Sequence, residues 1–389
     1  MTQAIWVWDL MANQLPADRV AKSAPFTPLA ASLPASVPFV GPEALERQRG
    51  VRFTARIGAN ESVFGPSPRA VAAMRAAAGE AWKYCDPENH ELKLALAAHH
   101  GIRPENVVVG EGIDGLFGYI VRMFVEPGVS VATSAGAYPT YNFHVTGFGG
   151  RLVTVPYRDD REDPTALVEL AAREQAPLIY FANPDNPMGT WWNAVAVASL
   201  IEAVPDGALL CLDEAYIDFA PAGTAPAINA DDPRVIRFRT FSKAHGMAGA
   251  RVGYAIGEAK VIKRFDAIRN HFGVNRMAQA GALASLGDAE HIAWVVAQVA
   301  AARDRIASIA AASGLKTLPS ATNFVAIDCG RDGTFARAVL DDLIARGIFV
   351  RMPGVAPLNR CIRVSAGTTA DLDAFEAALP AALRAASSG

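Results

Sequence analysis

Short apolar runs alternate along the chain with longer segments in which small and charged residues recur at helical spacing. Runs rich in β-branched residues predict strands at 106–109, 129–133, 152–155, 178–181, 209–213 and 235–240. Alanine-rich stretches at 68–78, 193–203 and 258–269 predict helices between and around these strands. Strands that alternate with helices are typical of a mostly parallel sheet with helices on both faces.

The C-terminal part repeats this pattern on a smaller scale. A long helical stretch covers about 288–313, strands are expected at 323–328, 348–351 and 361–365, and helices at about 333–346 and 370–386. Residues 1–50 contain six prolines and predict an extended arm with little regular structure. We therefore expect an N-terminal arm at 1–50, a large domain at 51–275 and a small C-terminal α/β domain at 276–389.

Composition narrows the possible functions. The 389 residues are 51% hydrophobic and 19% charged, which favours a sizeable buried core over disorder. The net charge is −3 and no basic tract reaches five residues, so nucleic acid is not expected as a partner. The four cysteines lack C-x-x-C spacing, so neither a metal site nor a disulfide framework is predicted. Without a signal-peptide pattern or a run of about 18 apolar residues, we expect a cytoplasmic protein with no membrane contact.

Candidate chemistry collects where predicted strands end, which is where open α/β sheets bind ligands. Asp213 ends the strand LLCLD, and its carboxylate suits the protonated ring nitrogen of a pyridine cofactor, although a helix cap is the simpler role. Lys243 follows the strand ending at Thr240 and can form an imine with a carbonyl cofactor, although most single lysines are solvated. Asn186 follows the strand LIYFA in a turn-forming string, and its amide can donate to a ring oxygen.

Several candidates suit anions. Residues 110–115 match G-x-G-x-x-G, but the next strand lacks the acidic residue that a dinucleotide fold requires, so a backbone cradle for one phosphate is expected. Arg251, helped by the Ser242 hydroxyl, can bind the same phosphate. Arg351 and Arg363 can clamp a substrate anion, although either alone is more simply explained by a surface ion pair.

Taken in order, these motifs resemble the class I/II pyridoxal-5′-phosphate (PLP) aminotransferases of fold type I, and within them the histidinol-phosphate aminotransferase branch. The resemblance covers about residues 36–370, and the DEAY string and the S-K-x7-R string at their mutual spacing are its specific parts. The matching strings are NES…GPSP at 60–68, YCD at 84–86, GEGID at 110–114, YPTY at 138–141, NPDNPMG at 183–189, DEAYIDF at 213–219, TFSKAHGMAGARVGY at 240–254, NFV at 323–325 and IRVSAGT at 362–368.

The resemblance implies PLP as cofactor, and a large domain with a mostly parallel central sheet plus a smaller C-terminal α/β domain. Lys243 would hold PLP as a Schiff base and shuttle a proton, and Asp213 would pair with the pyridinium nitrogen. Tyr84 would reach the cofactor of the neighbouring subunit, which makes a homodimer with a shared active site part of the prediction. The resemblance also implies that the cofactor ring is contacted by Tyr138, Asn186 and Tyr216. The cofactor phosphate would be bound by Gly112, Ile113, Asp114, Ser242 and Arg251. The substrate would be bound by Arg351, Arg363, Phe39 and Asn60.

Three positions differ from the pattern of that branch. Ile113-Asp114-Gly115 stands where Ser-Asp-Glu is usual, which removes a hydroxyl from the phosphate site but leaves the backbone cradle. SAGT replaces the commoner TVGT. Phe39 stands where a tyrosine is typical, so a hydroxyl for the substrate's phosphate is missing. We therefore expect an amino acid, such as an aromatic one, to be used at least as well as histidinol phosphate.

The predicted function is PLP-dependent transfer of an amino group from a small-molecule donor, an amino acid or a histidinol-phosphate-like amine, to a 2-oxo acid such as 2-oxoglutarate. A decarboxylase of the threonine-phosphate decarboxylase type would carry the same lysine, aspartate and arginine. A nicotinamide-dependent dehydrogenase built on residues 110–115 leaves the DEAY and S-K-x7-R strings unexplained. A non-catalytic PLP-binding regulator would need a DNA-binding segment, and residues 1–50 show no helix-turn-helix pattern.

Overall fold

The computed structural model describes residues 23–35 and 40–388. The chain divides into two units, 1–36 and 37–389, which are described separately. The described part of the first unit holds one short helix, α1 (Pro28–Ser32), capped by the Thr27 side chain. The second unit contains everything that follows. The division predicted at residue 275 remains a prediction.

A seven-stranded sheet forms the centre of the second unit, in the order β2-β8-β7-β6-β5-β3-β4. β8 runs antiparallel to both of its neighbours, and the pairings among β3 to β7 are parallel. Its strands are β2 (Val107–Gly110), β3 (Ser130–Ser134), β4 (Arg151–Val155), β5 (Leu178–Ala182), β6 (Leu209–Asp213), β7 (Val235–Thr240) and β8 (Gly253–Ile256). The six predicted strands of this region are confirmed within a residue or two, and β8 was not predicted.

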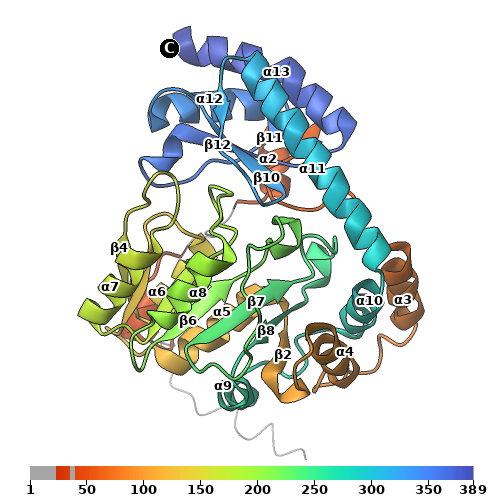
Figure 1. The fold of residues 1–389 in the computed structure, drawn as a ribbon. Helices are drawn as coiled ribbons and strands as arrows, with labels where there is room; N and C mark the ends of the chain where they lie inside the picture. The colour runs from red at the N-terminus through yellow and green to blue at the C-terminus, as the bar shows by residue number, and fades with distance from the viewer. Residues whose placement is uncertain (1–22, 36–39, 389) are drawn as a thin grey trace, which may run out of the picture. The chain divides into compact units, whose positions relative to one another are not determined.

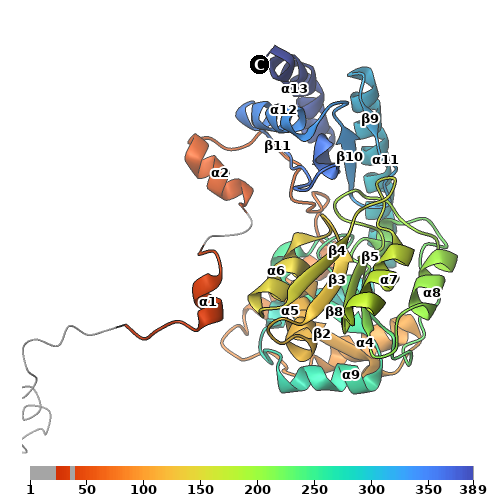
Figure 2. The ribbon, with the colours of Figure 1, turned by 90° about the vertical axis from the view of Figure 1, so that its left-hand side faces the viewer.

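Alternation along the central strands places successive side chains on opposite faces of the sheet. Tyr180 of β5 packs with Phe117 and Tyr141 on one face, whereas its neighbours Ile179 and Phe181 belong to the core of the other face. Figure 2 shows β3 to β5 between α6 on one side and α7 and α8 on the other. The helices concerned are α5 (Gly112–Phe124), α6 (Pro139–Gly147), α7 (Pro164–Glu174) and α8 (Ala194–Glu202). Burial on both faces explains why the strand sequences are almost continuously apolar.

A smaller three-stranded antiparallel sheet, β12-β10-β9, lies in the C-terminal part. Figure 1 shows this sheet beside α11, α12 and α13, with α11 running from there toward α3 and α10. The bounds are α11 (Ala289–Ala312), β9 (Lys316–Thr317), β10 (Phe324–Asp328), α12 (Gly333–Ala345), β12 (Cys361–Ser365) and α13 (Thr369–Ser388). In addition, β1 (Ala55–Arg56) pairs in parallel with β11 (Ile348–Phe349). This pairing brings the segment that follows β1, including Asn60, next to the C-terminal sheet.

The prediction that residues 1–50 form an extended arm with little regular structure is wrong for two segments. Besides α1, α2 (Pro42–Arg49) is a two-turn helix that ends at Gly50 with φ of 70°. Both helices have proline in their first turn, where its fixed φ fits and its missing N–H is not needed. Two of the six prolines that suggested an extended arm, Pro28 and Pro42, therefore start helices. The remaining helices are α3 (Pro68–Ala78), α4 (His90–His100), α9 (Ala259–Arg264) and α10 (Arg276–Leu286). No helix within 23–35 and 40–388 is long and apolar enough to cross a membrane.

Candidate active site

A cavity of about 720 Å³ opens at the carboxyl ends of the central strands, between the large sheet and the C-terminal one. Its position follows from the topology, because side chains at the ends of parallel strands gather at one edge of the sheet. The predicted residues that line it are Asn60, Ile113, Asp114, Tyr138, Asn186, Asp213, Tyr216, Ser242, Lys243, Arg251, Arg351 and Arg363. Residues separated by more than 300 positions in sequence thus meet in one chamber.

Asp213, the last residue of β6, is a buried acid on the cavity wall. Its carboxylate accepts hydrogen bonds from the Tyr180 hydroxyl (2.7 Å) and the Ala215 backbone N–H (2.9 Å). Burial raises the pKa of Asp213 to about 6, because desolvation outweighs these bonds. A cation placed against this carboxyl would favour its ionised form, and a protonated ring nitrogen is such a cation.

Lys243 lies just beyond β7, with its ammonium group facing the same chamber. Its Nζ donates to the backbone oxygen of Asn60 (2.9 Å) and stands 5.3 Å from the centre of the Tyr216 ring. Desolvation, followed by the charge of Arg363, lowers the pKa of Lys243 to about 8. A substantial share of this amine is therefore unprotonated in mildly alkaline solution, and an unprotonated amine is the nucleophile that attacks a carbonyl.

An anion cradle lies at the start of α5. Gly112 is its first residue and has φ of 78°, and a Cβ there would come within 2.6 Å of Arg251 Nη2. The free N–H groups of a helix N-terminus attract anions, and Arg251 adds a guanidinium on the same side. Ser242 accepts a hydrogen bond from the Thr240 hydroxyl (2.9 Å), which leaves its own proton free for a ligand. The Asp114 carboxylate is directed to His144 (2.9 Å).

Two arginines form the C-terminal wall. Arg363 lies on β12 and Arg351 follows β11, and their backbones form an antiparallel bridge. Arg363 Nη1 donates to Asn186 Oδ1, whereas the buried Arg363 Nε has no partner among the described residues. Arg351 donates to the backbone oxygen of Val40 (2.8 Å). A buried polar group without a partner is uncommon, and an acceptor placed beside this Nε would satisfy it.

Among the described residues, Tyr84 and Gly112 were predicted for the site but do not line the cavity, although Gly112 directly precedes Ile113, which does. Tyr84 is exposed, and its ring packs against Phe272 with a centroid distance of 4.8 Å. Its predicted contact with a neighbouring subunit stays a prediction. Phe39 lies outside the described residues. Conversely, Glu61, Met352 and Val355 line the cavity but were not predicted, because each belongs to a loop whose pattern resembles that of any exposed turn.

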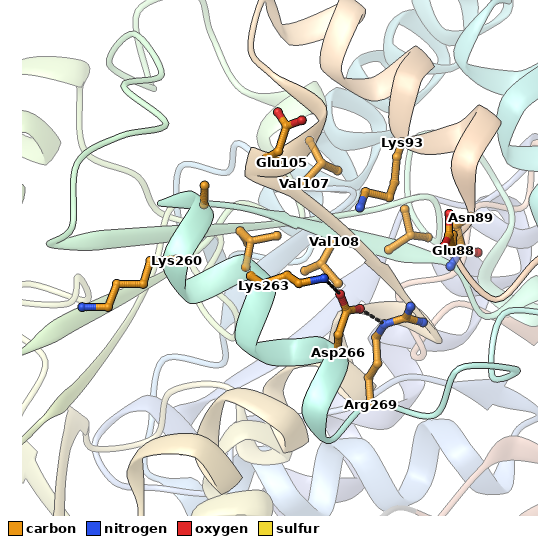
Figure 3. Close-up of a pocket in the computed structure, with 13 residues that line it drawn as sticks. Glu88, Asn89, Lys93, Glu105, Val107, Val108, Lys260, Lys263, Asp266 and Arg269 are labelled. Atoms are coloured by element: carbon orange, nitrogen blue, oxygen red, sulfur yellow. Dashed lines mark hydrogen bonds and ion pairs between the residues drawn. The ribbon is translucent and has the colours of Figure 1, made fainter.

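A second cavity, of about 460 Å³, lies among β2, α4 and α9 (Figure 3). Its apolar side is formed by 107–109, and its charged side pairs Asp266 with both Lys263 (3.2 Å) and Arg269 (2.9 Å). None of the predicted site residues that the structure describes lines it. The acid, amine and anion cradle that a PLP site needs therefore meet in the first cavity.

Comparisons with known proteins agree with this geometry. The family model for aminotransferase class I and II matches residues 55–379. Histidinol-phosphate aminotransferase from Moorella thermoacetica is 33% identical over 341 residues, covering 87% of each chain. The protein of that name from Anaeromyxobacter sp. is 36% identical over 357 residues, covering 90% of this chain and 97% of the relative.

Solved structures give the same result. The crystal structure of histidinol-phosphate aminotransferase from Sinorhizobium meliloti in complex with pyridoxal-5′-phosphate is 56% identical, with a TM-score of 0.91, and covers 94% of this chain and 99% of that one. Aspartate aminotransferase from Thermus thermophilus with maleate is 21% identical, with a TM-score of 0.78. The match covers 92% of this chain and 100% of that one, and it shows that the two share the fold.

These similarities confirm the predicted fold type I architecture and the predicted enzyme class. They also confirm PLP as the cofactor, which the cradle at Gly112, the amine of Lys243 and the acid of Asp213 fit. The individual roles assigned to site residues remain predictions. The chain belongs to the aminotransferase class I and II family.

Proposed function

We propose that this PLP-dependent aminotransferase takes its amino group from a primary amine that also carries an anionic group, and passes it to a 2-oxo acid such as 2-oxoglutarate. One observation carries the proposal. Lys243 stands in a single chamber with the buried acid Asp213, the start of α5 at 113–114 and the unmet guanidinium nitrogen of Arg363. The cradle and the arginine give the chamber two separate places for anions, one for the cofactor and one for the substrate.

When bound, PLP supplies an electron-accepting ring that makes the proton on the amine-bearing carbon of the donor removable. Asp213 would keep the ring nitrogen protonated, and Lys243, after releasing the cofactor, would move that proton as a general base and acid. Asn186 and Tyr216 would bind the ring oxygen, and Tyr138 would stack on the ring. The backbone at 112–114, with Ser242 and Arg251, would hold the phosphate.

The anion-binding wall accepts more than one donor. Arg363 and Arg351 can hold the phosphate of histidinol phosphate or the α-carboxylate of an amino acid, because both anions fit a guanidinium fork. The names of the similar proteins favour histidinol phosphate. Phe39 favours an aromatic amino acid, because it lacks the hydroxyl that a phosphate donor would use.

Steady-state kinetics with 2-oxoglutarate as acceptor decides between these donors. If Phe39 sets the preference, the best aromatic amino acid matches or exceeds histidinol phosphate in kcat/KM. Phe39→Tyr should then raise kcat/KM for histidinol phosphate roughly ten- to a hundredfold, the value of one hydrogen bond to a charged group. A hundredfold preference of the unmodified enzyme for histidinol phosphate over every amino acid would refute the argument from Phe39.

Product analysis separates transamination from the decarboxylase alternative. L-threonine-O-3-phosphate decarboxylase from Porphyromonas gingivalis shares the fold at a TM-score of 0.71 but only 19% identity, so the fold alone does not decide the reaction. An aminotransferase forms glutamate in proportion to the oxidised donor, whereas a decarboxylase releases carbon dioxide and forms none. Release of carbon dioxide without glutamate would overturn the proposal.

The assembly and location are also part of the proposal. We propose a homodimer in which Tyr84, exposed on its own chain, reaches the phosphate of the partner's cofactor. We place the protein in the cytoplasm. All four cysteines, at 85, 211, 329 and 361, are buried and unpaired, which suits a reducing compartment.

A further inference from the structure

Asn60 connects several groups of the cavity wall. It is 3% exposed and has φ of 56°, a left-handed conformation that asparagine adopts more readily than most residues. Its backbone oxygen accepts from Lys243 Nζ (2.9 Å) and from Asn323 Nδ2 (3.1 Å). Its side chain lies between Tyr216 and Ser365. The residue is therefore held from several sides, and its amide group has little freedom.

The hydrogen bonds of the Asn60 side chain have a fixed direction, and Ser365 sets it. The Asn60 backbone N–H, which can only donate, donates to Ser365 Oγ (3.0 Å). The single proton of the Ser365 hydroxyl then goes to Asn60 Oδ1 (3.0 Å). This leaves Asn60 Nδ2 to donate to Tyr216 Oη (3.0 Å). A flipped amide would leave the buried serine proton without this acceptor, which is unfavourable.

Tyr216 is consequently the acceptor of the last hydrogen bond in the series that runs from Ser365 through Asn60. Its hydroxyl donates to no other residue of the part of the chain that the structure describes, and the side chain lines the cavity. Its proton is thus available to an oxygen atom inside the cavity. Burial raises the pKa of Tyr216 to about 12, so the phenol keeps that proton.

We propose that Ser365 is a positioning residue that acts through Asn60 to fix Tyr216 as a hydrogen-bond donor to the ring oxygen of PLP. The inference rests on the ring contact proposed above for Tyr216. Ser365 and Arg363 lie two positions apart on β12, and alternate residues of a strand share a face. One strand thereby presents the arginine for the substrate anion and sets the direction of the hydrogen bond to the cofactor.

The proposal has a spectroscopic consequence. A donor to the negatively charged ring oxygen stabilises it and lowers the pH at which the cofactor bound at Lys243 loses its proton and changes colour. In Ser365→Ala the Asn60 amide is free to turn, and Tyr216 can donate to Asn60 instead of the cofactor. The pKa of the colour change should then rise by about one pH unit, the size expected for a hydrogen bond to a charged group.

The test is an absorbance titration of the holoenzyme against pH. The Tyr216→Phe variant gives the full shift in the pKa of the colour change that results from losing the donor. Ser365→Ala should reproduce most of this shift. Ser365→Thr, which retains the hydroxyl, is the matched control and should titrate like the unmodified protein. In the Tyr216→Phe background, Ser365→Ala should cause no further shift. Thermal unfolding of the apo forms verifies that each variant is folded.

The outcomes distinguish this inference from the function on which it rests. If Tyr216→Phe raises the pKa but Ser365→Ala does not, or if Ser365→Thr shifts it as much as Ser365→Ala, the positioning role is overturned while the proposed site stands. An additional shift in the double variant likewise contradicts a route through Tyr216. If Tyr216→Phe itself leaves the pKa unchanged, the ring contact assigned to Tyr216 is wrong, and the inference is overturned with it.

Discussion

Two demands on the Asp213 carboxyl conflict in the apo protein. It must be ionised to hold a protonated ring nitrogen, yet it is buried, and burial raises its pKa to about 6 from an ordinary value near 3.8. A folded acid with a raised pKa stabilises the fold while it is protonated. This contribution is complete below about pH 4 and is lost as the pH rises through about 6. The apo protein therefore carries an unfavourable buried charge at neutral pH, which the proposed contact with the cofactor's ring nitrogen would neutralise.

Asp213→Asn removes that charge and should affect the apo and holo proteins in opposite directions. For the apo form, unfolding free energies of variant and unmodified protein should diverge by about 2–3 kcal/mol in favour of the variant between pH 4 and pH 7. The holo form should lose most of its activity, because an amide is no anion for the ring nitrogen. Denaturant unfolding across this pH range, together with turnover at saturating cofactor, checks both. A pH-independent difference, or near-normal turnover, would contradict the role of Asp213.

At the same scale, the sequence motifs predicted which residue types line the site but not how they bond to one another. Lys243, Asp213 and Arg251 follow from strand ends and from the spacing of specific strings. The hydrogen bonds between Ser365 and Asn60 join positions 305 residues apart, and no local sequence pattern predicts such a pair. The pairing of β1 with β11 creates this neighbourhood, and two-residue strands are too short to show a period in the sequence.

Among the elements, the first turn of α5 owes its proposed role in phosphate binding to its backbone geometry. Gly112 needs its φ of 78° and its missing Cβ, since a side chain would meet the Arg251 guanidinium at 2.6 Å. The parallel strands were predictable because burial on both faces makes them long apolar runs. β8 was missed because it begins with a glycine and overlaps the end of the string at 240–254, which was assigned to cofactor binding.

Gly112→Ala should weaken PLP binding at least tenfold, because the methyl group displaces Arg251 and strains the turn that carries the cradle. The matched control is Gly128→Ala, which has a similar φ of 89° but open space around the new methyl group. Both variants should lose about 1–2 kcal/mol of stability from the left-handed backbone. Only Gly112→Ala should change the dissociation constant of PLP, measured by fluorescence titration of the apo protein. Equal cofactor affinity in the two variants would argue against the cradle.

For the whole molecule, the proposed homodimer means that each active site takes a residue from the partner subunit. Tyr84 is 80% exposed and lies outside the cavity of its own chain, although the family resemblance assigns it to the cofactor phosphate. Large exposed aromatic side chains, such as Tyr84 and Phe272, fit a surface that a partner covers.

Subunit mixing tests the shared site. Lys243→Ala should be inactive and Tyr84→Ala inactive or severely impaired. If Tyr84 acts across the interface, a hybrid dimer contains one site with both lesions and one site with neither. Activity should therefore return in part after subunit exchange, up to about half of the unmodified specific activity per hybrid. Differently tagged chains allow the heterodimer to be isolated and assayed. An isolated heterodimer without activity would mean that Tyr84 does not serve the partner's site.

The covalent attachment of the cofactor at Lys243 tests the central claim most directly. The purified protein should be yellow, and borohydride should fix the cofactor irreversibly to the lysine that carries it. Because Lys243 faces the cavity with a pKa lowered to about 8, we expect the reduced adduct on the peptide that contains Lys243, at one cofactor per chain. Lys243→Ala should yield no adduct, while Lys260→Ala, a change at the second cavity, should yield the full amount. Mass mapping that places the adduct on another lysine, or an unmodified Lys243 after complete reduction of a coloured protein, would contradict the account.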